Sequence, residues 1–274
     1  MKTEIAIIGM SGRFPGSNNI EEFWKHLENN KNLVTETPKN RWDWKASGEI
    51  TRYSGFLSDV DMFDASFFNI TPREAEVMDP QQRLLLEETW NAIENSGIKP
   101  SSLRGTNTGV FVGMCNNDYN QLLIENNIPN DIFTSTGIDY SLISNRISYF
   151  FGFHGPNMTV DTACSSSLVA IHNAVNAIKN NECKYAIAGG VNLCLTPRRH
   201  LAFENAKILT ADGKCKTFDE RADGYVRGEG VGVIILKKLK HAIQDGDEIL
   251  AVIKGSGVNH GGSSVSLTAP SENA

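Results

Sequence analysis

The sequence lacks the long hydrophobic run that a transmembrane helix needs. Nowhere in its 274 residues do about eighteen apolar residues follow one another. The apolar run at residues 5–8 is too short for the core of a secretory signal peptide, and no small-residue cleavage site follows it. We therefore expect no membrane span and a cytoplasmic location.

Cysteines are few, and their spacing does not suit structural bonding. There are 5, at positions 115, 164, 183, 194 and 215, and no two have the CxxC spacing of zinc and thiol redox motifs. An odd number of scattered cysteines argues against a disulfide framework and against a zinc site. We expect most of these thiols to be reduced and structural.

The sequence also has no excess of positive charge. Its formal net charge is -6, and its basic residues are scattered, the densest groups being residues 198–199 and 237–240. A nucleic-acid-binding protein needs a strong basic field, so we expect no nucleic-acid partner. No low-complexity linker and no short repeat divides the chain, and we predict a single domain.

Short apolar segments bounded by glycine alternate with segments of helical periodicity. Strands are predicted at residues 4–8, 109–113, 158–161, 185–188, 231–236 and 249–254. Helices are predicted at residues 20–29, from the Thr71–Glu74 capping box, at residues 79–97 and at residues 165–180. This order indicates an α/β layered fold with a mixed sheet. Residues 255–274 follow the last strand as a glycine- and serine-rich tail.

The most informative position is Cys164, which lies where a predicted strand ends and a helix begins. Unpaired N–H groups and the positive end of the helix dipole stabilise a thiolate at such a turn. The same N–H groups can donate to the oxygen of a tetrahedral intermediate. The small neighbours Ala163, Ser165 and Ser166 would let an acyl thioester approach closely. The alternative reading of Cys164 is a small core residue at a tight turn.

The flanking sequence decides between these readings. The stretch Asp-Thr-Ala-Cys-Ser-Ser-Ser-Leu at residues 161–168 resembles the active-site signature of β-ketoacyl synthases from modular polyketide assembly lines. Further segments are similar to the same family in the same order, at residues 5–16, 71–83, 145–150 and 223–230. The Asn-His-Gly-Gly stretch at residues 259–262 is similar to synthases of assembly lines with free-standing acyltransferases.

The resemblance implies a fold, a reaction and partners. The fold would be thiolase-like, an α/β/α/β/α arrangement of which residues 1–274 form the N-terminal half and the start of the second half. Cys164 would accept an acyl group from the phosphopantetheine arm of an acyl carrier protein and then condense it with a decarboxylated malonyl-type extender. The chain would form a homodimer, work beside other polyketide synthase domains and bind no cofactor directly.

The family's two catalytic histidines lie in HGTGT-like and KxNxGH-like motifs, and neither motif occurs here. We therefore assign no histidine to catalysis, and expect this chain to be acylated but not to condense without the C-terminal portion. His172 is predicted on a packing or dimer surface, His200 at an exposed position, and His26 and His241 on helix surfaces. His154 and His260 fall in loops.

Further predictions concern binding. Besides Ala163 and Ser165, Met114 and Cys115 are predicted to line the acyl pocket, because the corresponding family loop lies near the nucleophile; for Met114 a core-filling role is the alternative. Residues 133–139 are predicted to reach across a dimer interface. A non-elongating module that only passes acyl chains between carriers remains the alternative function. Residues 9–12 only loosely match a dinucleotide fingerprint, because Pro15 interrupts the helix that motif needs.

Overall fold

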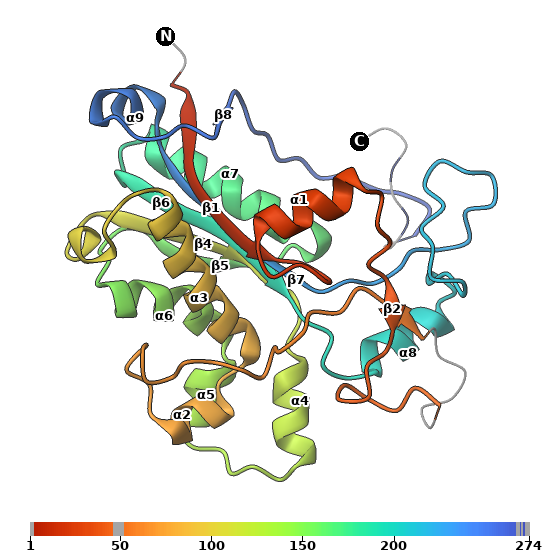
Figure 1. Cartoon of the computed structure of the whole chain (residues 1–274). Helices are drawn as coiled ribbons and strands as arrows, with labels where there is room; N and C mark the ends of the chain where they lie inside the picture. The colour runs from red at the N-terminus through yellow and green to blue at the C-terminus, as the bar shows by residue number, and fades with distance from the viewer. Residues whose placement is uncertain (1–2, 46–51, 267–268, 270, 272–274) are drawn as a thin grey trace.

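A computed structural model describes residues 3–45, 52–266, 269 and 271. Its centre is a six-stranded mixed sheet with the order β5-β4-β6-β7-β1-β8. The strands β5, β4 and β6 are parallel to one another, whereas β7, β1 and β8 each pair antiparallel with the preceding strand in this order. Figure 1 shows the sheet running diagonally, with α7 on its upper side and α3 and α6 on its lower side.

The strands are β1 Ile5–Arg13, β2 Thr35–Glu36, β3 Tyr53–Ser54, β4 Thr108–Gly113, β5 Asn157–Val160, β6 Tyr185–Asn192, β7 Gly230–Lys238 and β8 Ala251–Ile253. The helices are α1 Ile20–Glu28, α2 Pro72–Val77, α3 Pro80–Asn95, α4 Asp118–Glu125, α5 Ile132–Ile138, α6 Tyr140–Phe151, α7 Ser166–Lys179, α8 Arg198–Asn205 and α9 Leu239–Asp245, with 3-10 turns η1 Pro100–Leu103 and η2 Ala163–Ser165.

Alternation along the strands divides the core between the two faces of the sheet. In β4, Val110 and Val112 pack with the leucines of α3, whereas Phe111 packs with Ala174 and Ile178 of α7. All six residues of β4 are buried, as expected for a strand covered on both faces. The sheet therefore forms the middle layer of the part of the chain that the structure describes.

The sequence-based predictions agree with this architecture. Each predicted strand is present within a few residues, the sheet is mixed, and Thr71 caps α2 by accepting from the Glu74 N–H. The predicted tail after residue 254 has no regular structure where it is described; residues 267, 268, 270 and 272–274 lie outside the described residues. Among the described residues, no helix is long and apolar enough to cross a membrane. The cytoplasmic location stays a prediction.

The first strand is longer than its prediction. It continues past residue 8 to Arg13, and Gly9 lies inside it rather than in a loop. A Cβ at Gly9 would lie 2.5 Å from the Ala92 carbonyl oxygen, so glycine is needed here for close packing of α3 on the sheet. The resemblance of this segment to a dinucleotide-binding loop therefore has no structural basis.

Candidate functional site

Cys164 occupies the turn between β5 and α7, as its sequence context predicts. A single 3-10 turn, η2, carries it from the end of the strand to the first residue of the helix, Ser166. Ala163, just before it, has a φ of 55°, a left-handed conformation that is unusual for alanine. The turn is therefore sharp, and it leaves Cys164 exposed while the following helix is packed into the core.

Two strand ends make room for this turn. Gly113 ends β4, and a Cβ there would lie 2.5 Å from the Ser166 carbonyl carbon and from the Ser167 nitrogen. Gly190, in β6, would place a Cβ 2.8 Å from that of Ser167. The absence of side chains at both glycines lets the N-terminus of α7 lie directly on the sheet. Cys164 is thereby held at the carboxyl end of the parallel strands.

Side chains around the turn satisfy most of its backbone groups. Asp161 accepts from the Ala163 N–H at 3.0 Å, and the Ser166 hydroxyl accepts from the Thr162 N–H at 2.9 Å and donates to the Ala163 carbonyl at 2.7 Å. Among the described residues, none accepts a hydrogen bond from the Cys164 N–H. That group is free to donate to an oxygen placed beside the thiol.

The thiol opens into a cavity of about 700 Å³. Its walls come from the ends of β1, β4, β6 and β7, the start of α7, and the segment around residues 225–229. Its lining includes Met10, Ser11, Phe14, Ile20, Gly113, Met114, Cys115, Ala163, Cys164, Ser166, Ile171, Val191, Asn192, Arg199, Phe203, Tyr225, Arg227 and Glu229. A cysteine at the edge of a largely apolar cavity suits a covalently held acyl chain.

Three of the four predicted pocket residues lie in this cavity. Met114 is buried at 1% exposure, and Cys115 and Ala163 also form part of the wall. Burial raises the pKa of the Cys115 thiol, and the nearby Arg199 charge opposes that shift, so burial disfavours a thiolate at Cys115. Ser165 is not in the cavity lining; its hydroxyl instead donates to the Thr162 carbonyl at 2.9 Å.

The sequence-based predictions did not include the part of the cavity wall that carries its two arginines. Arg199 and Phe203 come from α8, and Tyr225 and Arg227 from the long loop that leads into β7. Both segments are polar and without clear periodicity, and the only signal was that residues 223–230 match the family pattern. Which of these side chains would face Cys164 depends on how the loop folds.

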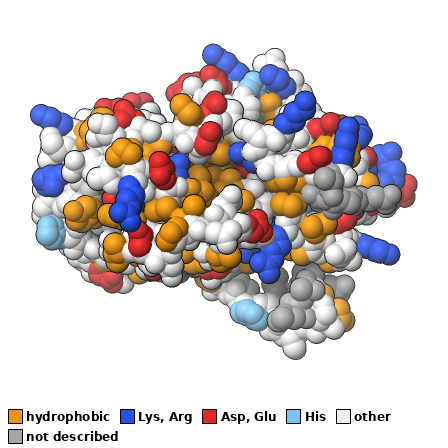
Figure 2. All heavy atoms as spheres, turned by 90° about the horizontal axis from the view of Figure 1, so that it is seen from below, with side chains coloured by type: hydrophobic (Ala, Val, Ile, Leu, Met, Phe, Trp, Pro, Cys, Tyr) orange, Lys and Arg blue, Asp and Glu red, His pale blue; other side chains and the backbone are white. Residues whose placement is uncertain are grey.

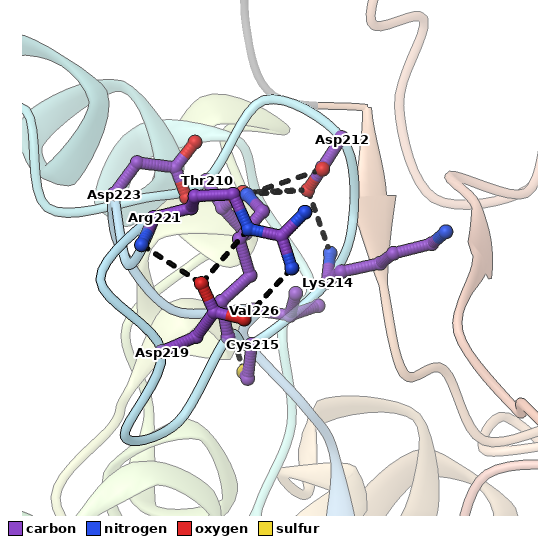
Figure 3. Close-up of polar contacts among 9 residues, drawn as sticks. Thr210, Asp212, Lys214, Cys215, Asp219, Arg221, Asp223 and Val226 are labelled. Atoms are coloured by element: carbon purple, nitrogen blue, oxygen red, sulfur yellow. Dashed lines mark hydrogen bonds and ion pairs between the residues drawn. The ribbon is translucent and has the colours of Figure 1, made fainter.

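Ion pairs hold that loop in place, as Figure 3 shows. Lys216 bridges Asp212 and Asp223, at 3.1 and 2.6 Å, and Arg221 pairs with Asp219 at 2.8 Å. The Cys215 sulfur accepts from the Val226 N–H at 3.2 Å. The loop thus presents Tyr225 and Arg227 to the cavity on a scaffold of local polar contacts.

The histidines differ from expectation in one case. His200 was predicted to be exposed, but it is 1% exposed, between Ser54 and Arg227. It lies on the inward face of α8. This helix is short and rich in polar residues, so its sequence has no clear apolar periodicity. His172 is on α7 and bonds to Ser256 at 2.9 Å, and the described residues hold no cluster of three metal-ligating side chains. Among the residues that the structure describes, no histidine lines the cavity.

Comparison with known proteins agrees with the geometry of this site. Residues 2–242 match the family model described as "Beta-ketoacyl synthase, N-terminal domain". The chain is 48% identical over 279 residues to polyketide synthase PksN of Bacillus subtilis strain 168, covering 98% of this chain and 5% of that protein.

Two solved structures share the fold. The ketosynthase from module 6 of the bacillaene synthase of Bacillus subtilis 168 matches with a TM-score of 0.92 and 41% identity, over 98% of this chain and 46% of that one. The oxazolomycin ketosynthase domain OzmH KS7 of Streptomyces albus JA3453 matches with a TM-score of 0.92 and 36% identity, over 98% and 48%. The chain therefore spans about half the length of these solved ketosynthases, and the predicted thiolase-like α/β fold is confirmed.

Proposed function

The chain belongs to the β-ketoacyl synthase family, and on that premise we propose that it is the acyl-accepting portion of a polyketide ketosynthase domain. The observation that carries the proposal is the exposed Cys164 thiol at the N-terminus of α7, on the edge of a largely apolar cavity. Acyl carrier proteins and other polyketide synthase domains would be its partners, and the carrier's phosphopantetheine arm would deliver the substrate.

The first step is thioester exchange. The Cys164 thiolate attacks the carbonyl carbon of the acyl-carrier thioester, and the oxygen of the tetrahedral intermediate accepts from the Cys164 N–H. The intermediate collapses with cleavage of the carrier's C–S bond, and the phosphopantetheine thiolate leaves and takes up a proton. The thioester that breaks and the thioester that forms have nearly the same free energy. Binding of the acyl chain in the cavity therefore sets the direction of transfer.

The second step is decarboxylative condensation. A malonyl-type extender on a second carrier loses CO2, and the resulting enolate attacks the Cys164 thioester carbonyl. A C–C bond forms, the Cys164–acyl bond breaks, and the thiolate is restored. We propose that residues 1–274 form the N-terminal portion of the domain and that the rest of the domain supplies the two histidines for this step.

We also propose a homodimer. The strand β5 is at the edge of the sheet, and three large side chains around it are exposed: Tyr149 of α6, Met158 of β5 and Leu168 of α7, at 84%, 39% and 71%. An unpaired edge with apolar flanks favours pairing with a second copy. The lower face formed by α2, α4 and α5 also gathers apolar side chains (Figure 2). Ile132, the first residue of α5, is 69% exposed. This supports the predicted contact of residues 133–139 with a partner.

Intact-mass measurement tests the function. The full-length ketosynthase that contains this chain is incubated with acyl-loaded carrier protein, and wild type is expected to gain the acyl mass. Cys164→Ala should gain none, whereas Cys215→Ser, which changes an exposed thiol outside the cavity lining and keeps an acceptor for the Val226 N–H, should be acylated normally. Acyl mass retained on Cys164→Ala would overturn the assignment of the nucleophile.

Adding malonyl-loaded carrier then separates two kinds of ketosynthase. Release of a β-ketoacyl carrier product, two carbons longer, identifies an elongating enzyme. Acylation of Cys164 with no CO2 released from malonyl-loaded carrier, followed by transfer of the acyl group to a carrier whose phosphopantetheine thiol is free, identifies a module that passes acyl chains without extending them.

A further inference from the structure

Arg227 is a buried cation without a counter-ion. It is 7% exposed, and among the described residues no carboxylate forms an ion pair with it. Its guanidinium lies over the Phe203 ring, with 5.2 Å to the ring centroid, and its Nη1 donates to Nδ1 of His200 at 3.2 Å. The guanidinium can donate more hydrogen bonds than one imidazole nitrogen accepts, and its other nitrogens are not fully enclosed.

His200 fixes the orientation of this guanidinium. Because arginine can only donate, Nδ1 of His200 must be the acceptor, and Nε2 carries the proton and donates to the Ser54 hydroxyl at 2.9 Å. Burial, with a smaller effect of Arg227, lowers the pKa of His200 to about 3. The imidazole is thus neutral at physiological pH, and it positions Arg227 without competing for charge.

The rest of the Arg227 guanidinium is available to a ligand. Its Nε and Nη2 make no hydrogen bond to another described residue, and Arg227 forms part of the same cavity wall as Cys164. The neighbouring Glu229 carboxylate is occupied by Arg41 and by two backbone N–H groups. Arg199, the second arginine on the wall, is partly committed to the Cys115 carbonyl at 2.8 Å.

We propose that Arg227 is a specificity-determining residue that binds an oxygen atom of the acyl group carried by Cys164, so that the cavity selects hydroxyl- or keto-bearing acyl chains over saturated ones. The proposal rests on the proposed function, because it requires an acyl group on Cys164. The apolar remainder of the wall would hold the hydrocarbon part of the chain, and the guanidinium supplies charge-assisted donors at one place along it.

The carboxylate of the malonyl extender is a less suitable ligand for the Arg227 guanidinium than an oxygen of the acyl chain. A guanidinium paired with that carboxylate would stabilise the ground-state anion and oppose the loss of CO2. The phosphate of the carrier arm is the other anion that could reach an arginine, and the experiment separates it from an oxygen on the acyl chain.

The test measures the rate of Cys164 acylation by intact mass in the full-length ketosynthase. The donors are N-acetylcysteamine thioesters, which have no phosphate, in two matched pairs: butanoyl with 3-hydroxybutanoyl, and hexanoyl with 5-hydroxyhexanoyl. Arg227→Met should slow the hydroxylated member of at least one pair by about ten-fold or more and leave its saturated partner within about two-fold. Arg227→Lys, which keeps the charge but loses the planar fork, should fall between.

Arg198→Met is the matched control, because Arg198 is exposed on the same helix as His200 and outside the cavity lining. It should change neither rate, and circular dichroism checks that each variant is folded. If Arg227→Met does not fold, Arg227→Lys is used instead: slower acylation by the hydroxylated donor than by its saturated partner supports the inference, and equal rates relative to wild type overturn it.

If Arg227→Met changes the acylation rates of both members of each pair equally, the inference about Arg227 is wrong and the proposed function still stands. The same acyl groups are also supplied as coenzyme A thioesters, whose pantetheine arm carries phosphate. A loss of rate confined to these donors would also overturn the inference and assign Arg227 to the carrier-arm phosphate. No acylation of wild type by any donor would overturn the proposed function and this inference with it.

Discussion

Arg41 and Glu229 are 188 positions apart in the chain, yet their side chains form an ion pair at 3.1 Å with exposures of 7% and 0%. Glu229 also accepts from the N–H groups of Leu57 at 2.7 Å and Cys194 at 2.8 Å. Burial raises the pKa of Glu229, and Arg41 opposes that shift. One carboxylate thus joins the N-terminal loop, the end of β6 and the start of β7 beside the cavity.

Arg41→Met should destabilise the protein by about 3–5 kcal/mol, because it leaves the Glu229 carboxylate buried without its cation. The double variant Arg41→Met/Glu229→Gln should cost less than the sum of the two single variants. Urea unfolding followed by circular dichroism measures all three. Strict additivity would show that the two side chains are not energetically coupled.

Gly113→Ala should disturb the turn that carries Cys164, since the new Cβ would meet backbone atoms of Ser166 and Ser167 at 2.5 Å. We expect a loss of stability of about 2 kcal/mol or more and slower iodoacetamide labelling of Cys164. Gly255→Ala, where a Cβ meets nothing within 4 Å, is the control. Unchanged stability and labelling in Gly113→Ala would mean that α7 can shift without cost.

Asp79→Asn should change how stability depends on pH. Burial raises the pKa of Asp79 from 3.8 to about 6, so the folded state favours the protonated carboxyl. The stability linked to this group is complete below about pH 4 and is lost as pH rises through 6, by about 3 kcal/mol. The stability of Asp79→Asn relative to wild type should therefore rise between pH 4 and pH 7.

Unfolding by urea at pH 4 and pH 7 measures this difference. Asparagine can still cap α3 by accepting from the Gln81 N–H, whereas Asp79→Ala loses the cap and serves as the comparison. A difference between wild type and Asp79→Asn that is the same at both pH values would contradict the raised pKa.

Met114→Trp should shift acyl-chain preference toward shorter chains, because Met114 lines the cavity and is 1% exposed. The larger side chain would fill part of the space beside Cys164, and overpacking should cost about 1–3 kcal/mol of stability. Acylation rates with a series of thioesters of increasing length measure the preference. Met62→Trp, at an exposed position outside this cavity, should leave the dependence of rate on chain length unchanged. If Met114→Trp also leaves it unchanged, Met114 does not contact the acyl chain.

Local sequence was sufficient for the strand–turn–helix that carries Cys164. Its signals act over a few residues: an apolar run at β5, small residues at the turn, and helical periodicity in α7. The helices α4, α5, α6 and α8 were not predicted, because their stability comes from distant contacts. Asp118 in α4, for example, accepts from the N–H groups of Leu195 and Thr196 at 3.0 and 3.2 Å.

By itself, the sequence determined the family, the α/β class and the position of the thiol, since these depend on a contiguous signature and on short-range periodicity. Only the tertiary structure decided which polar groups face that thiol. Arg227 is 63 residues beyond Cys164 in the numbering, in a loop without periodicity, and His200 reaches it from a separate helix. Polar side chains on loops take their surroundings from long-range packing, which no local pattern encodes.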